Sequence, residues 1–287
     1  MSEYKTKTPT IEEMLEAGLH FGHPVRRKHP LMDEYVYAVE KKNSIIDLYQ
    51  TEEKFQKALD FLYEIAKSGK QIIIVGTKRQ AADKVAEAAR NAGALFVNER
   101  WLGGTLTNFN SVKGNCDTLK ELEEGLKTNR FDKYTKKEKL LIARRIEKLE
   151  TLVGGIREIR KYPAAVVVID PKREKTVLKE AQALNIPVVA LIDTNTDPRM
   201  VDFPVPGNDD AMKAIALFLD VVSAVIAEGY ANQPKEEAKP TKVEAKVEPK
   251  AETKSEVKVE RPAKAKVEAK KPAKPAAKKP TTKKAAK

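Results

Sequence analysis

The sequence predicts an α/β fold: a parallel sheet with helices on both sides, an inserted antiparallel coiled-coil helical hairpin, and a disordered basic C-terminal tail. Short β-branched runs alternate with amphipathic stretches, which is the pattern of parallel strands joined by crossover helices. Two long apolar seams without a strand interrupt this alternation, and the C-terminal segment has no apolar period. We therefore divide the chain into a body, 1–107 and 155–232, a hairpin, 108–154, and a tail, 233–287.

The first half of the body contains two predicted helices and two predicted strands. Apolar residues recur every three or four positions over 52–67, which is typical of an amphipathic helix. The run 71–75 is continuous and rich in isoleucine, so we expect a strand that is buried on both faces of the sheet. A helix with small alanines on its inner face follows over 79–91, and a weaker strand pattern occupies 94–97.

The hairpin is predicted from two apolar seams that are joined by the polar stretch 128–135. The seams are Val112, Cys116, Leu119, Leu122 and Leu126, and then Ile142, Ile146, Leu149, Val153 and Ile156. Their members are three or four residues apart, which is the spacing of helices that pack along a common seam. In this interpretation Cys116 is a seam residue rather than a reactive thiol.

The second half of the body repeats the pattern of strand and helix. The runs 164–169 and 187–192 are apolar, rich in valine or isoleucine, and each is followed by an aspartate. A helix-like stretch over 174–184 lies between them, and the last predicted helix covers 209–228. These runs extend the same parallel sheet.

Most of the net charge of +12 lies in the tail, which holds 18 Lys or Arg residues against 8 Glu. Such a segment cannot bury enough apolar surface to offset its ordering entropy, so we expect it to be disordered. The single cysteine excludes a disulfide framework and indicates a reducing compartment. No uninterrupted run of about 18 apolar residues occurs, and the N-terminus lacks the layout of a secretory signal. We expect a cytoplasmic protein that does not enter a membrane.

The turn 76–79, Gly-Thr-Lys-Arg, follows the first core strand at the place where an open α/β sheet binds phosphate. It has neither the Walker spacing nor the dinucleotide spacing of glycines. We therefore interpret it as a strand-to-helix turn whose cations, Lys78 and Arg79, face solvent or a backbone phosphate.

Several carboxylates are expected at the carboxyl edge of the sheet: Asp170, Asp193, Asp197, Asp209 and Asp210. An enzyme would use such a cluster to hold Mg²⁺. The segment 193–198 also fits consecutive Asx turns, and Asp209 fits the N-cap of the last helix. We favour this structural interpretation and leave a structural divalent ion open as the alternative.

Histidines form the other metal candidate, because His20 and His23 have a two-residue gap and His29 is near. A zinc site would need further ligands. We favour loop packing or phosphate contact and expect no cofactor, with His20, His23, Asp193 and Asp209 as the weak metal candidates. Neither a nucleophile elbow nor a paired catalytic cysteine is present, so no catalytic residue is predicted.

Basic clusters are the stronger functional signal. Arg26, Arg27 and Lys28 follow a Gly-His-Pro turn, and the hairpin loop is rich in lysine with only Asp132 against it. Trp101 either stacks on a base or packs where the hairpin leaves the body. The candidate RNA contacts are Arg26, Arg27, Lys28, Lys78, Arg79, Arg100, Trp101, Arg130, Lys133, Lys136 and Lys137.

Six ordered blocks resemble the small-subunit ribosomal protein two family, the S-two family, of bacterial type. The blocks are 14–23 (MLEAGLHFGH), 45–48 (IIDL), 75–80 (VGTKRQ), 100–109 (RWLGGTLTNF), 193–198 (DTNTDP) and 206–211 (PGNDDA). They extend over nearly all of the body, and their order and spacing match the family. The long tail goes beyond the family's usual pattern.

This resemblance implies a flavodoxin-like three-layer domain with a coiled-coil hairpin, assembled late onto the small ribosomal subunit near the junction of head and body. It also implies contacts with small-subunit ribosomal RNA and neighbouring proteins, and a docking surface for the mRNA-binding ribosomal protein S-one. The implied role is structural, in translation.

Two other functions are the alternatives to this one. A nucleotide- or phosphoester-using enzyme of doubly wound fold would have its site at 76–79 and Asp170, but no complete phosphate loop supports it. A free RNA-binding regulator would share the basic surface but would not accompany ribosomal subunits.

Overall fold

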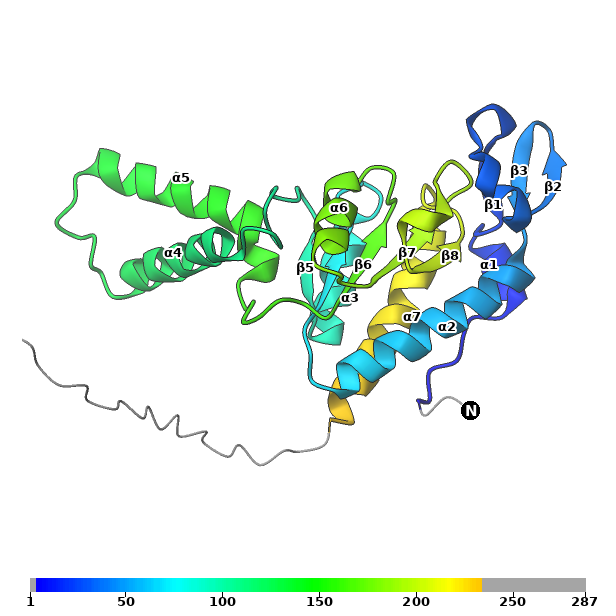
Figure 1. Cartoon of the computed structure of the whole chain (residues 1–287). Coiled ribbons are helices and arrows are strands. Elements are labelled where there is room, and N and C mark those ends of the chain that lie inside the picture. The colour runs from blue at the N-terminus through cyan, green and yellow to red at the C-terminus, as the bar shows by residue number, and fades with distance from the viewer. Residues whose placement is uncertain (1–3, 234–287) are drawn as a thin grey trace, which may run out of the picture. The chain divides into compact units, whose positions relative to one another are not determined.

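The computed structural model describes residues 4–233, and its centre is a five-stranded sheet of order β5-β4-β6-β7-β8 (Figure 1). The strands are β4 Ile72–Val75, β5 Leu95–Val97, β6 Ala165–Ile169, β7 Val188–Ile192 and β8 Phe203–Pro206. All neighbouring pairs are parallel, and every residue of β4, β6 and β7 is buried. The prediction of an α/β fold on buried parallel strands is confirmed.

Helices cover both faces of this sheet. The first face carries α2 Leu48–Lys67, α3 Ala82–Ala92 and α7 Met212–Ala231, and the second carries α6 Lys175–Ala183. Successive residues of a strand alternate between the two cores, so Ile74 faces the first and Ile73 the second. α2 begins before its predicted start because Asp47 caps it, accepting a hydrogen bond from the Tyr49 amide at 3.0 Å.

By length and composition alone, α7 would also fit a membrane span. Its packing accounts for the same apolar character. The Phe218 ring stacks on the Phe55 ring of α2 with 5.1 Å between centroids, and both side chains are buried. A Cβ on Gly229 would lie 2.5 Å from the Cβ of Ala66, so the two helices approach closely there. We interpret α7 as the central core helix of the first face.

The N-terminal part contains elements that the sequence analysis did not predict. They are α1 Ile11–Glu16, β1 Phe21–Pro24, the 3-10 helices η1 Val25–Arg27 and η2 Pro30–Tyr35, β2 Val36–Glu40 and β3 Asn43–Ile46. The three strands form a small antiparallel sheet of order β1-β3-β2. Each of these helices and strands is too short to show a recognisable hydrophobic period in the sequence. β8 was not predicted either, since its two prolines suit only an edge strand.

Two helices, α4 Phe109–Lys127 and α5 Lys136–Val153, occupy the predicted hairpin and pack against each other (Figure 1). Leu119 and Cys116 are buried in the second core, Ile146 is partly buried, and Leu126, near the connecting turn, is 48 % exposed. The apolar contact is therefore tight at the base and open toward the tip. Burial raises the pKa of the Cys116 thiol, in keeping with a packing role. The coiled-coil geometry stays a prediction, and the predicted tail lies outside the described residues apart from Gln233.

Candidate nucleic-acid interface

The carboxyl edge of the parallel sheet holds a largely buried ionic cluster around Lys78. Its Nζ lies 2.8 Å from Oδ1 of Asp209, 2.5 Å from Oδ1 of Asp210 and 3.6 Å from Oδ2 of Asp170. These residues follow different strands, and parallel strands end at one edge, so the topology brings them together. The Lys78 side chain is 11 % exposed. Its charge is committed to internal carboxylates, which favours a structural role over the RNA contact predicted for it.

His23 joins the same cluster from β1. Its Nδ1 lies 2.7 Å from Oδ2 of Asp193, and its Nε2 lies 3.5 Å from Oδ2 of Asp210 and 3.0 Å from Nδ2 of Asn195. The His23 amide donates to Oγ1 of Thr194 at 2.9 Å. These contacts attach the small N-terminal sheet to the carboxyl edge of the parallel sheet.

Burial and like charges shift the protonation of this cluster. Burial, with Asp170 and Asp193 nearby, raises the pKa of Asp209 from 3.8 to about 7, although Lys78 opposes the shift. The hydrogen bond to Asp193 raises the pKa of His23 against the effect of burial. Burial lowers the pKa of Lys78, but hydrogen bonds to Asp209 and Asp210 outweigh it and the net pKa is raised. Among the described residues, Oδ2 of Asp209 is buried without a hydrogen-bond partner.

Three side chains of this cluster have the geometry of metal ligands. One ligand atom from each of His23, Asp193 and Asp210 lies within 4.8 Å of the others, and imidazole with carboxylate is a donor set that suits zinc. Of the four predicted metal candidates, only His23 and Asp193 belong to this group, because Asp209 pairs with Lys78 and Asp210 supplies the third ligand atom. His20 lies apart, with its ring centroid 3.9 Å from that of Phe21, and burial lowers its pKa.

The predicted N-cap at Asp209 is wrong. Asp209 is held by Lys78, and α7 begins at Met212. Asn208 shapes the turn instead, since its Oδ1 accepts from the amides of Asp210 at 2.9 Å and Ala211 at 3.2 Å. The Asx turn predicted at Asp197 is confirmed, because its Oδ1 accepts from the Arg199 amide at 3.0 Å.

Exposed cations surround this edge of the sheet. Arg26 and Arg27 lie on η1, just after His23, and Arg79 follows Lys78; all three are exposed and have no ion pair among the described residues. Lys28 differs, because it pairs with Asp33.

Arg173, which follows β6, is a further exposed cation and is not among the contacts predicted from the sequence. Its Nε donates to Oγ1 of Thr77 at 3.1 Å, so it lies beside the turn that carries Arg79. Its position directly after a core strand was the available signal. We call Arg26, Arg27, Arg79 and Arg173 the body patch.

The loop 100–107 carries two of the predicted RNA contacts, Arg100 and Trp101, and their environments differ. Arg100 is exposed and has no ion pair in the described part of the chain. Trp101 is 7 % exposed, belongs to the second core and donates its Nε1 to Oε1 of Glu180 at 3.2 Å. These contacts favour packing over base stacking for Trp101.

The hairpin tip carries the other predicted cations. Arg130, Lys133, Lys136 and Lys137 are all exposed, and none has an ion pair within 4–233. Tyr134 lies among them and is 47 % exposed. We call these four cations the tip patch. Arg144, Arg145 and Lys148 on α5 are exposed as well. They are not among the predicted contacts, because the only signal in this stretch of the sequence is its apolar seam.

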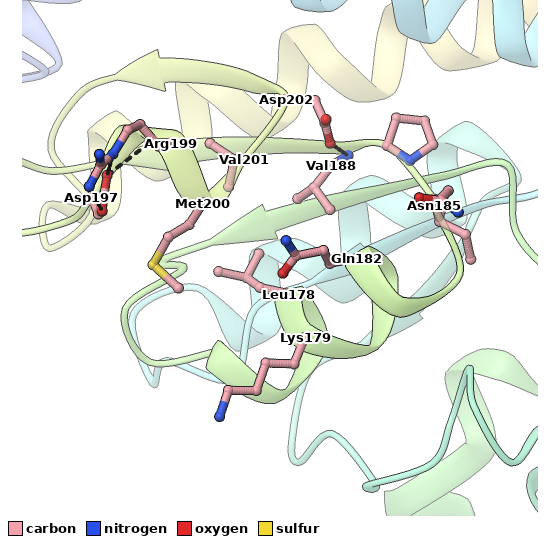
Figure 2. Close-up of a pocket in the computed structure, with 12 residues that line it drawn as sticks. Leu178, Lys179, Gln182, Asn185, Val188, Asp197, Arg199, Met200, Val201 and Asp202 are labelled. Atoms are coloured by element: carbon pink, nitrogen blue, oxygen red, sulfur yellow. Dashed lines mark hydrogen bonds and ion pairs between the residues drawn. The ribbon is translucent and has the colours of Figure 1, made fainter.

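A pocket of about 580 Å³ lies between α6 and the segment 197–202 (Figure 2). Leu178, Lys179, Gln182 and Met200 are among the residues that line it. Its two carboxylates are already engaged, Asp197 with Arg199 and Asp202 with the Val188 amide. Neither the turn 76–79 nor the Lys78 cluster lines this pocket, so it does not support the enzyme hypothesis.

We expect the free energy of unfolding to fall as the pH rises from 3.8 to about 7 because of Asp209. Over this range the folded protein keeps the Asp209 proton and the unfolded chain loses it, so the folded state binds more protons and is weakened by rising pH. The raised pKa of His23 acts in the same direction, as its stabilising charge is lost when the pH passes that pKa. Urea unfolding between about pH 5 and pH 8 measures the slope. Asp209→Asn should make the decline shallower, and equal slopes in both proteins would contradict this.

Comparison with known proteins places these features in one family. A family model described as ribosomal protein S2 matches residues 14–229. The chain is 46 % identical to small ribosomal subunit protein uS2c of Cyanophora paradoxa over 220 residues, which are 77 % of this chain and 94 % of that protein. It is 42 % identical to uS2 of Maridesulfovibrio salexigens over 240 residues, covering 83 % and 93 %, and 43 % identical to uS2 of a Nitratiruptor species over 246 residues, covering 83 % and 92 %.

Proposed function

Because the chain belongs to the ribosomal protein S2 family, we propose that its body patch and tip patch bind small-subunit ribosomal RNA at two separated places. Family membership makes the protein a structural constituent of the cytoplasmic small ribosomal subunit and not an enzyme. The proposal concerns which residues make the RNA contacts.

One observation carries the proposal: exposed cations that have no carboxylate partner within residues 4–233 gather at the carboxyl edge of the sheet and at the hairpin turn. Phosphate contacts position a protein on RNA, and unpaired arginine and lysine side chains on turns supply them at little structural cost. Lys78 and Trp101 are engaged inside the protein, so we leave them out of the contact set.

The proposal also includes finer features of the family resemblance. We infer that α4 and α5 form a coiled-coil arm, 108–154, distinct from the α/β body, and that the protein lies near the junction of head and body. Docking of the mRNA-binding ribosomal protein S-one is a further part, supported by the resemblance alone. Measuring the amount of S-one on subunits with and without this chain tests it.

Replacing either patch with glutamine is expected to weaken RNA binding without unfolding the protein. The body variant is R26Q/R27Q/R79Q, which keeps Arg173 because that side chain also donates to Thr77, and the tip variant is R130Q/K133Q/K136Q/K137Q. Each lost phosphate contact should reduce the log-log salt slope of binding by roughly 0.7 to 0.9. Filter binding of small-subunit ribosomal RNA across a salt series measures both the affinity and the slope.

A matched control removes three cations that are already paired with carboxylates, K57Q/K84Q/R199Q. Each of these cations is neutralised by a neighbouring carboxylate, so we expect the salt slope of RNA binding to change less than in the body variant. If both patch variants enter subunits normally at physiological salt, the proposed RNA surface is wrong.

A further inference from the structure

Glu180 on α6 is a buried carboxylate with no cationic partner among the described residues. Four N–H groups of one loop surround it. Its Oε1 accepts from Nε1 of Trp101 at 3.2 Å and the Gly104 amide at 2.8 Å, and its Oε2 accepts from the amides of Leu106 at 2.9 Å and Thr107 at 3.4 Å. A buried carboxylate is costly unless such donors replace its water. All these donors belong to the segment that leads into α4.

The loop itself is tightly folded around these contacts. The Asn108 amide donates to the Gly104 carbonyl at 2.8 Å, and Oγ1 of Thr105 donates to the Leu102 carbonyl at 2.6 Å. Gly104 has φ of +90°, a conformation that favours glycine. The next residue after Asn108 is the first of α4, so the position of the loop fixes the start of that helix.

The hairpin has a second attachment at the end of α5. A Cβ on Gly155 would lie 2.2 Å from the Phe96 carbonyl oxygen, so this turn lies directly on β5. The apolar side chains of Cys116 and Leu119 also pack the base of the hairpin in the second core, but apolar packing is non-directional. The Glu180 contacts add directional hydrogen bonds at the start of α4.

We propose that Glu180 is a positioning residue for RNA binding, which holds α4 and thereby keeps the tip patch in a fixed orientation to the body patch. This inference rests on the proposed function. Two sites on a rigid frame bind one RNA more tightly than the same sites on a loose frame, because the second contact forms at a high effective concentration. Glu180 itself touches no RNA in this scheme.

Glu180→Gln tests the proposal while keeping the size of the side chain. One oxygen becomes an NH₂ group, which cannot accept from the loop amides and would face them with its own hydrogens. RNA affinity is compared in the full chain with and without the tip variant, in both backgrounds. We expect the tip substitutions to lower the RNA affinity of the wild-type protein about tenfold. They should lower the RNA affinity of the Glu180→Gln protein much less, because that protein has already lost the joint binding of the two patches. Equal tip effects in the two backgrounds would overturn the proposal.

Ser223→Ala is the control, since Ser223 is also a buried polar residue but donates to the Asp220 carbonyl within α7 and contacts neither the loop nor a patch residue. The tip effect should be the same there as in wild type. If Glu180→Gln does not fold, Trp101→Phe removes one donor and should lower the tip effect partway; an unchanged tip effect would again overturn the proposal.

A second readout does not depend on RNA. Spin labels on K70C and K133C, both exposed positions, report the distance between body and tip. We expect Glu180→Gln to broaden this distance distribution, and an unchanged distribution would overturn the positioning role. If the tip variant has no effect on RNA binding in the wild-type background, the proposed function is contradicted. The spin-label distances would still test the positioning role of Glu180, because they do not depend on RNA.

Discussion

Lys78→Met is expected to lower the free energy of unfolding by about 3–5 kcal/mol, as for a buried ion pair that loses one partner. Methionine has a similar length but no charge, so Asp209, which is 1 % exposed, would be left beside Asp170 and Asp193 without a cation. Removing Lys78 also removes the group that lowers the pKa of Asp209. Asp209 would then protonate more readily, so we expect the loss to be larger at high pH than at low pH.

Chemical unfolding at two pH values measures this effect. Lys57→Met is the control, because Lys57 pairs with Glu53 at 2.5 Å on the surface and both side chains are more than half exposed. Such an exposed pair contributes little to stability. If the two substitutions cost the same, the Lys78 cluster is not a stabilising core. If Lys78→Met leaves stability intact and reduces RNA affinity, Lys78 is the phosphate contact that its position in the sequence suggests.

Leu119→Asp has the second large expected effect, a loss of about 3–5 kcal/mol by analogy with an unpaired buried charge. Leu119 is fully buried where α4 meets the second core. Ile146 is only partly buried, so Ile146→Asp should cost about 1–2 kcal/mol. Leu141, on the outer side of α5, is 55 % exposed, and Leu141→Asp should stay within about 0.5 kcal/mol.

The three substitutions place the same charge at decreasing burial along the hairpin. Urea unfolding followed by far-ultraviolet circular dichroism and by Trp101 fluorescence compares them. A similar cost for Leu119→Asp and Leu141→Asp would refute the packing of α4 on the body. The order expected from the structure differs from that of the sequence, where all seam positions are equivalent.

The core of the parallel sheet was predictable because its signal is local. β4, β6 and β7 are continuous apolar runs, and strands buried on both faces need no longer-range information to be recognised. The small N-terminal sheet lacked this signal, since β2 is largely exposed and β1 is short. β8 contains two prolines, which are tolerated only because the strand lies at the edge of the sheet and pairs with β7 alone.

The residues of the candidate site were predictable from the sequence, but which of its cations are buried and which are exposed was not. Lys78 and Arg79 are neighbours on one turn, and the sequence treats them as equals. The fold turns Lys78 toward Asp209 and Asp210 and leaves Arg79 exposed. That outcome depends on carboxylates more than 130 residues away in the chain, which only the order of the strands brings to Lys78.

The sequence by itself determined the α/β class, the two helices of the hairpin, the concentration of cations at the tip, and the six blocks that match the family. Each follows from residues that are close together in the chain. Only the tertiary structure decided which charges are buried: it enclosed Lys78, joined His23 to Asp193, and set Glu180 against the loop that begins α4. The physical reason is that desolvation and hydrogen-bond partners are supplied by distant segments, so a side chain's charge has no fixed role until those segments have packed around it.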